Sequence, residues 1–469
     1  MFAESDTSVV RPIPGPSLAG GGSPAWERQV WAATVAGMTL LAMAWMAYQS
    51  HRYFFVTDAS PPRRTTLGAI DVRNRYEETR SWFQRELVYG SYGDAVYPPA
   101  TYAMLRLVFN AMPWALAKPL WFVGSLVAVG ILSWQLVRFS LVQTSWQRWF
   151  VAVLPWAMYA TGAALGNGQF VLFVVPLVLN AVLLLAEEPR SNRDTWMGTL
   201  LMLGALIQPT IAAPFFWLIL FRVRGYQPAV RVVGVYLLLT AVAVPFQVNA
   251  RHIEPPIAKV DEPVSQIPPP INPAVLGHGK IGKTPANPLL RWLRRGVRGT
   301  YYGSVKGGYG SVHNLLATPE LAQWNLLASL GILGALGLWI FLHRRVDLWL
   351  LLGVTAIVAR VWIYHRWYDD LLLILPLITL CRLTKQPHFS PRIKTFAAIL
   401  FLWLWMFLLA PGVLYTFAKP QLPIAIQVTG WLATLVFLAL LAARERRGLP
   451  ARETERPSTA SPPVAPLPV

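Results

Sequence analysis

The chain is poor in charged residues and has almost no cysteine. Only 13% of its 469 residues are Asp, Glu, Lys or Arg, whereas soluble globular proteins carry about 25%. This composition excludes an ordinary soluble domain of this length. The single cysteine, Cys381, excludes an intramolecular disulfide framework and leaves the redox compartment undetermined. A signal-peptide pattern is also lacking at the start, so the first apolar run is predicted to be a retained membrane span.

The chain has instead a series of long apolar runs. Each approaches the ~20 residues that an α-helix needs to cross the hydrocarbon core of a bilayer. The clearest runs are 28–48, 119–137, 169–186, 230–247, 321–342, 346–363, 395–415 and 424–443. The sequence therefore predicts an all-α, polytopic membrane protein of about twelve transmembrane helices.

Polar segments divide the chain into a membrane domain and two tails. Residues 1–26 and 449–469 are rich in Pro, Ser, Gly and Ala, which predicts disordered cytoplasmic tails. Residues 27–448 form the predicted transmembrane domain. Two long polar segments, 49–96 and 249–320, interrupt it and are predicted to be extracytoplasmic loops that carry interfacial helices.

The excess of basic residues indicates how the chain is oriented. The formal net charge is +19, but the basic residues lie in loops and form no basic domain, which argues against nucleic-acid binding. Lys and Arg in short loops resist translocation. These short basic loops are 138–148, 222–231, 344–345, 382–394 and 444–447. Assigning them to the cytoplasm places both termini inside and both long polar segments outside the cell inner (plasma) membrane.

Two segments leave the path of the chain open. Residues 97–112 are short for a span, and residues 195–221 fit either one tilted helix or two short ones. If 97–112 only dips into the membrane and 195–221 breaks at Gln208-Pro209, all short basic loops fall inside. The alternative exports Arg138 and Arg148 and buries Gln208 at the midplane of the bilayer.

The first path brings the most polar span ends to the outer face. Ionisable groups placed there are functional candidates, because inserting one costs roughly 2.5–3.5 kcal/mol. An aromatic belt with a snorkelling arginine is one interpretation of residues 364–370. Two consecutive carboxylates beside a histidine and an arginine exceed what a belt requires, so a polar site is favoured. Its members are His365, Arg366, Tyr368, Asp369 and Asp370.

Two further outer elements carry polar candidates. Asp71 is flanked by Arg73 and Arg75, and the aromatic residues that follow, up to Tyr97-Pro98-Pro99, predict that this segment folds back onto the membrane surface. A solvated surface pair would contribute little to stability. Gly166-Asn167-Gly168-Gln169 opens a span with amides that suit an anion or a sugar hydroxyl, although a tight turn explains the same residues.

A basic cluster lies in the second outer segment. Arg291, Arg294 and Arg295 fall in an amphipathic run that suits a lipid headgroup or a phosphate, or forms an ordinary basic interfacial helix. No spacing of His, Asp and Glu resembles a metal cage, so we expect neither a metal nor a cofactor.

At these residues the chain resembles the GT-C superfamily of membrane glycosyltransferases, in particular the GT87 group of polyprenyl-phosphate-mannose-dependent mannosyltransferase-like proteins. That group places an Asp after the first span, then a Tyr-Pro-Pro element, a Gly-Gln opening a later span, a Lys-Pro in a broken span and a late aromatic-acidic stretch. The matching residues are Asp71, Tyr97-Pro98-Pro99, Gly168-Gln169, Gln208-Pro209 and Tyr368-Asp369. One position departs from the pattern, since Gln208 stands where a basic residue is expected.

The resemblance implies an inverting transfer of a sugar, mannose or another hexose, from a polyprenyl-phosphate donor to a hydroxyl of a lipid or glycan acceptor. Asp71 would be the catalytic base. Together, the resemblance and the polar clusters described above predict that the donor is bound by Arg73, Arg75, Tyr97, Asn167, Gln169, Gln208, Arg291, Arg294, Arg295, His365, Arg366, Tyr368, Asp369 and Asp370. A secondary transporter and a lipid-linked glycan polymerase or ligase remain the alternatives.

Overall fold

The computed structural model describes ten ranges of the chain: 24–56, 68–91, 95–186, 191–223, 225–251, 287–293, 310–312, 321, 324–412 and 421–448. These residues form helices and connections, with no strand among them. The predicted tails lie outside them, apart from residues 24–26, and so does most of 252–320.

Six helices are long and apolar enough to cross a membrane, or seven if the bent pair α7 (Tyr159–Asn167) and α8 (Val171–Ala186) forms one span. The six are α1 (Ala25–Phe55), α5 (Trp114–Phe139), α11 (Gln227–Ala243) with the short η1 (Val244–Gln247) after it, α15 (Asn325–Leu342), α18 (Pro391–Leu408) and α19 (Gln421–Gly448). The described part of the chain is therefore that of an all-helical protein with several helices suited to a bilayer.

Shorter helices complete the fold. They are α2 (Ile70–Phe83), α3 (Val88–Ser91), α4 (Pro99–Phe109), α6 (Ser145–Ala157), α9 (Asn192–Ala205), α10 (Pro209–Phe221), α16 (Leu348–Val361), η4 (Trp367–Leu373) and α17 (Ile374–Lys385). Local chemistry fixes several starts. Ser191 and Asp194 form a capping box at α9, Asp347 caps α16, and Pro209 occupies the first turn of α10.

The two segments whose path the sequence left open have clear structures. Within 97–112, the helix α4 has 11 residues, which at 1.5 Å per residue is about half of the ~30 Å hydrocarbon core. Residues 195–221 form two helices, since α9 ends at Ala205 and α10 begins at Pro209. The chain therefore breaks at Gln208-Pro209.

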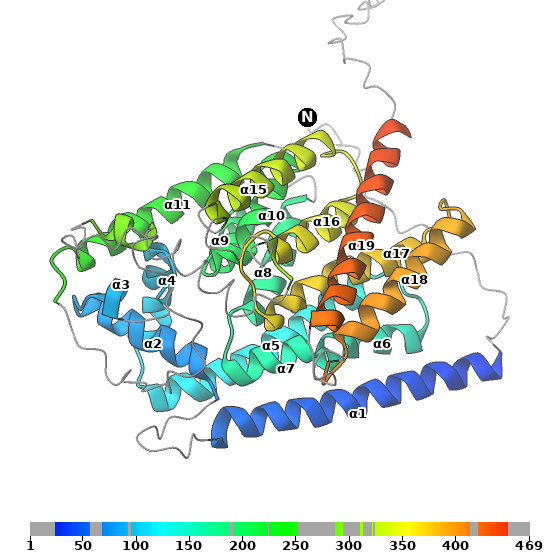
Figure 1. Ribbon diagram of the computed structural model, residues 1–469, viewed down its shortest axis with the longest axis horizontal. Coiled ribbons are helices and arrows are strands. Elements are labelled where there is room, and N and C mark those ends of the chain that lie inside the picture. The colour runs from blue at the N-terminus through cyan, green and yellow to red at the C-terminus, as the bar shows by residue number, and fades with distance from the viewer. Residues whose placement is uncertain are drawn as a thin grey trace, which may run out of the picture.

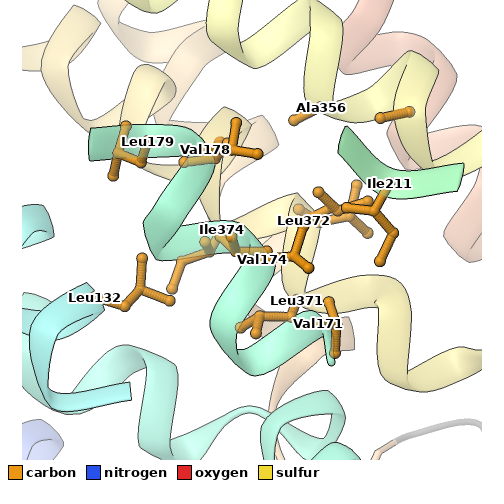
Figure 2. Packing of buried hydrophobic residues seen from close by; sticks show 14 of the residues in the cluster. Leu132, Val171, Val174, Val178, Leu179, Ile211, Ala356, Leu371, Leu372 and Ile374 are labelled. Atoms are coloured by element: carbon orange, nitrogen blue, oxygen red, sulfur yellow. The ribbon is translucent and has the colours of Figure 1, made fainter. Parts of the chain in front are cut away.

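The core of the bundle is formed by its shorter helices. Valines of α8, at positions 171, 174 and 178, pack with Leu371, Leu372 and Ile374 of the η4–α17 segment and with Ile211 of α10 (Figure 2). The long helices α1 and α11 behave differently, because only 17% of the apolar window of each is buried. Their remaining apolar surface fits contact with lipid.

Helices α2, α3 and α4 gather at one end of the bundle, where α1 and α11 also end (Figure 1). Trp82 of α2 stacks on Tyr102 of α4 with ring centroids 4.4 Å apart. The indole Nε1 of Trp82 also donates to the carbonyl oxygen of Ala243 at 2.9 Å. Helices α2, α3 and α4, which follow α1, thus fold back and pack against the ends of the long helices. We call these three helices the platform.

Candidate functional site

The platform and the α7–α8 break meet at Asp71. The N–H of Ala69 donates to the carbonyl oxygen of Gly166 at 2.9 Å, which joins the start of α2 to the end of α7. Gln169 Nε2 donates to Asp71 Oδ2. Asn167 Oδ1 accepts from Arg52 Nη2 at 2.8 Å, so both amides of the motif are engaged by side chains from other elements. The half-buried Asp71 carboxylate is therefore held at the N-terminal end of α8.

The turn at Gly168 makes this approach possible. Its φ of +73° lies in the left-handed region that favours glycine. A Cβ built at this position would lie 2.5 Å from Cγ1 of Val72, the residue that follows Asp71. Glycine is thus needed both for the backbone conformation and for the close contact with α2.

The polar run at residues 364–370, here called the late run, has charged groups that interact with Asp71. Burial is the main cause that raises the pKa of Tyr97; Arg75 opposes the rise, while the charges of Asp71 and Asp369 add to it. Burial alone would lower the pKa of Arg366, but Tyr368, Tyr364 and Asp71 outweigh it and raise that pKa. Asp71, Tyr97 and the 366–369 segment are consequently close enough to interact, with Tyr97 protonated and Arg366 cationic at neutral pH.

The two arginines beside Asp71 differ in their surroundings. Arg75 forms a buried ion pair with Glu78 at 2.6 Å, and its guanidinium lies 4.7 Å from the centre of the Tyr97 ring. Burial alone would lower the pKa of Arg75. The charge of Glu78, together with smaller effects that include Asp71, outweighs burial and raises that pKa. Arg73 pairs instead with Glu77 at 2.8 Å on a half-exposed face. Arg75 is therefore part of the platform and orients Tyr97, whereas Arg73 lies toward solvent.

The consecutive carboxylates of η4 have separate environments. Asp369 Oδ2 lies 3.1 Å from His365 Nδ1 and accepts the backbone N–H of Arg366, also at 3.1 Å. Asp370 is bound in the interior by Arg360 of α16 and Tyr159 of α7, with Gln427 Nε2 of α19 at 3.3 Å. Asp369 thus belongs to the site, and Asp370 anchors η4 to three helices.

Three buried polar atoms here are unsatisfied within the described part of the chain. His365 Nε2, Asp369 Oδ1 and Gln208 Oε1 are buried and have no hydrogen-bond partner among the described residues. Leaving such an atom unpaired costs about 1–3 kcal/mol. Buried polar atoms without a protein partner indicate a bound water or a ligand position. These three atoms therefore mark where the site can take up a polar molecule.

The Gln208-Pro209 break lies beside the late run. Trp362 Nε1 donates to the carbonyl oxygen of Thr210 at 2.8 Å, and Thr101 Oγ1 donates to that of Ile207 at 3.0 Å. The break is therefore held from one side by the helix that leads into the late run and from the other by α4.

The basic cluster of the second long polar segment, residues 249–320, is only partly described. Arg291 lies in a helical stretch at 288–293 and donates through Nη1 to the carbonyl oxygen of Gln247 at 3.4 Å. Trp292 Nε1 donates to the carbonyl oxygen of Val96 at 3.0 Å, next to Tyr97. Arg294 and Arg295 lie outside the described residues. Arg291 is thus placed on the platform, one connection away from Tyr97.

Sequence reasoning missed three residues that hold η4 in place: Tyr159, Arg360 and Gln427. Arg360 could have been found, since it is an ionisable residue inside the apolar run 346–363. No signal marks Tyr159 or Gln427. In the part of the chain that the structure describes, no group of three or more His, Cys, Asp or Glu side chains could hold a metal ion.

Comparison of the chain with protein-family models, with curated proteins and with solved structures gives no match. The interpretation of the site therefore depends on its own geometry and chemistry.

Proposed function

We propose that this chain is a GT-C-type glycosyltransferase, similar to the GT87 group, that moves a hexose from a polyprenyl phosphate to an acceptor hydroxyl. The observation that carries the proposal is that Asp71 lies within electrostatic range of Arg366, next to the buried His365–Asp369 pair, at one end of an apolar helical bundle. A polyprenyl chain stays in the bilayer while its phosphate and sugar reach the interface. An enzyme for such a donor needs a polar site at the ends of its spans.

In the proposed reaction the acceptor oxygen attacks the anomeric carbon from the face opposite the phosphate, which inverts that carbon. The bond between this carbon and the phosphate oxygen breaks, and polyprenyl phosphate leaves with the electron pair. The acceptor proton passes to the carboxylate of Asp71. A positioned base of this kind contributes roughly 10²–10⁴-fold to the rate. The amide of Gln169 fixes the direction of the carboxylate.

The leaving phosphate gains negative charge during bond breaking, so fixed donors beside it stabilise the transition state. Arg366 offers the nearest cation to Asp71 in the late run, and its Nε is oriented by the hydroxyl oxygen of Tyr364 at 2.9 Å. Tyr97 remains protonated because burial raises its pKa, so its hydroxyl can donate to the same phosphate.

The proposal includes twelve crossings of the inner (plasma) membrane, with both termini in the cytoplasm and the site outside. Six of these crossings are α6, α8, α9, α10, α16 and α17, which are short for a span but pack inside the bundle, so they need not match the lipid thickness on their own. The orientation is supported by Arg138, Arg222, Arg344, Arg382 and Arg446, all at helix ends opposite the site.

The test uses purified protein with radiolabelled polyprenyl-phosphate mannose, glucose and arabinose in separate reactions, with total membrane lipid as the acceptor pool. The proposal expects label on an acceptor and release of free polyprenyl phosphate. A transporter would move the intact donor across vesicles, and a polymerase or ligase would use only a lipid-linked glycan. Absence of transfer from all three donors, with either of those activities present, would contradict the proposal.

A further inference from the structure

Helices α10 and α15 lie side by side and run in the same direction. Phe221 packs on Phe341 with ring centroids 5.4 Å apart, and a Cβ at Gly337 would lie 2.9 Å from the indole of Trp217. In both pairs the partners are 120 positions apart in the chain. The offset is therefore the same in both pairs, and it places Ser329 of α15 level with Pro209, where α10 begins.

The outer contacts support this register. Ser329 Oγ donates to the carbonyl oxygen of Trp362 at 3.0 Å, and Trp362 Nε1 donates to the carbonyl oxygen of Thr210 at 2.8 Å. Asn325 lies one turn before Ser329, and His365 lies three residues after Trp362. Asn325, Gln208 and His365 thus come from three elements that meet at the outer end of the bundle.

Asn325 is a second buried amide in this region. It is 2% exposed, and neither Nδ2 nor Oδ1 has a hydrogen-bond partner among the residues that the structure describes. Gln208, which is 7% exposed and directly precedes α10, has an unsatisfied Oε1 among the described residues. A protein interior does not normally leave both ends of an amide unpaired.

The hydrogen-bonding capacity of these atoms indicates which class of ligand fits between them. Asn325 offers one donating and one accepting group, and Gln208 Oε1 only accepts. A phosphate only accepts, so it would leave both amide oxygens unsatisfied, and a cation would leave the amide nitrogen unsatisfied. A hydroxyl both donates and accepts, so neighbouring hydroxyls of one sugar ring satisfy all three atoms. An uncharged pocket of this kind also explains why position 208 carries an amide and no cation.

We infer that Asn325 and Gln208 recognise hydroxyls of the sugar and thereby determine which donor is used. The inference rests on the proposed function, because it locates the sugar half of the same donor. The phosphate of the same donor is then bound by Arg366, whose side chain is exposed. Asn325 is then a specificity-determining residue, and its unsatisfied amide is retained for binding at some expense to stability.

The experiment measures binding to the full-length protein in detergent by calorimetry, with farnesyl phosphate and farnesyl-phosphoryl mannose, glucose and arabinose as probes. Wild type is expected to bind one of the sugar-bearing probes more tightly than farnesyl phosphate. Asn325→Leu and Gln208→Met should each reduce that preference about 3- to 10-fold, the loss expected for one or two hydrogen bonds. Affinity for farnesyl phosphate should not change.

The matched control is Gln135→Leu. Gln135 Oε1 is also buried without a partner in the described chain, but it lies near the opposite end of α5 from the site. Its variant should bind every probe as wild type does. The unliganded Asn325→Leu protein should melt at or above the wild-type temperature, because leucine removes an unsatisfied amide. A lower melting temperature together with unchanged sugar preference would overturn the inference and assign Asn325 a structural water.

The remaining outcomes separate the inference from the proposed function. If wild type binds farnesyl phosphate and gains nothing from any sugar, the inference is wrong and the lipid-phosphate part of the proposed function stands. Equal weakening of all probes in both variants also overturns the inference, because it assigns the amides to the phosphate or to the fold. If wild type binds no probe, the proposed function fails and the inference fails with it.

Discussion

Replacing Asp370 by asparagine removes the counter-charge of a fully buried arginine. Arg360 and Asp370 are 0% and 1% exposed as side chains, and Tyr159 and Gln427 donate to the same carboxylate. Breaking a buried pair from one side destabilises a protein by about 3–5 kcal/mol, because the remaining charge stays desolvated. For a chain of this length, whose unfolding entropy scales with the number of residues, this lowers the melting temperature by about 3–5 °C.

The assay is thermal unfolding in detergent, followed by intrinsic tryptophan fluorescence. Two variants serve as controls. Glu77→Gln breaks the half-exposed pair with Arg73, which contributes about 0–1 kcal/mol, and should leave the melting temperature nearly unchanged. Asp369→Asn should also keep stability, because the amide oxygen can still accept from the backbone N–H of Arg366 and face His365 while the NH2 group takes the position of Oδ1, which lacks a partner among the described residues; it should nevertheless lose activity. Equal melting temperatures for Asp370→Asn and Asp369→Asn would refute the division of the two carboxylates into anchor and site.

Three more predictions follow from the geometry. Gly168→Ala should lower kcat at least 10-fold and reduce stability, since alanine disfavours the positive φ of that turn; wild-type transfer rates in this variant would contradict the proposed role of the turn. Arg366→Ala should reduce kcat/KM about 10²-fold while Arg73→Ala reduces it less than 3-fold, because only the first is expected to contact the phosphate; steady-state transfer assays decide, and equal effects would remove Arg366 from the reacting centre. In a Cys381→Ser background, Ser265→Cys should react with an impermeant thiol reagent in intact cells, whereas labelling only after permeabilisation would invert the orientation.

The class of the fold could be predicted from sequence because its causes are local. Low charge and long apolar runs require helices that satisfy their own backbone hydrogen bonds in lipid. The break at Gln208-Pro209 was also readable, since proline favours the first turn of a helix and disfavours its interior. The described helices include six or seven that are long and apolar enough to cross a membrane, so the count of twelve spans stays a prediction.

The details of the site depend on contacts that are distant in the sequence. In a 3₁₀ helix consecutive residues point about 120° apart, so the sequence cannot tell which of Asp369 and Asp370 faces the site. The partners of Asp370 come from three other helices, and Asn325 reads as an ordinary polar residue at a span boundary. The sequence predicts that Asp71, Gln169 and the late run lie on the same face of the protein. It does not predict which of their side chains are in contact.

The most direct test of the account is the transfer activity of Asp71→Asn. Asparagine keeps the shape of the side chain but cannot take up the acceptor proton, so kcat should fall roughly 10²-fold or more with unchanged expression and donor binding. The matched control is Asp194→Asn, which alters a partly exposed capping aspartate at the opposite end of the bundle and should keep full activity. An Asp71→Asn enzyme with a wild-type kcat, beside an inactive Asp369→Asn enzyme, would show that the base lies in the late run and contradict the central assignment.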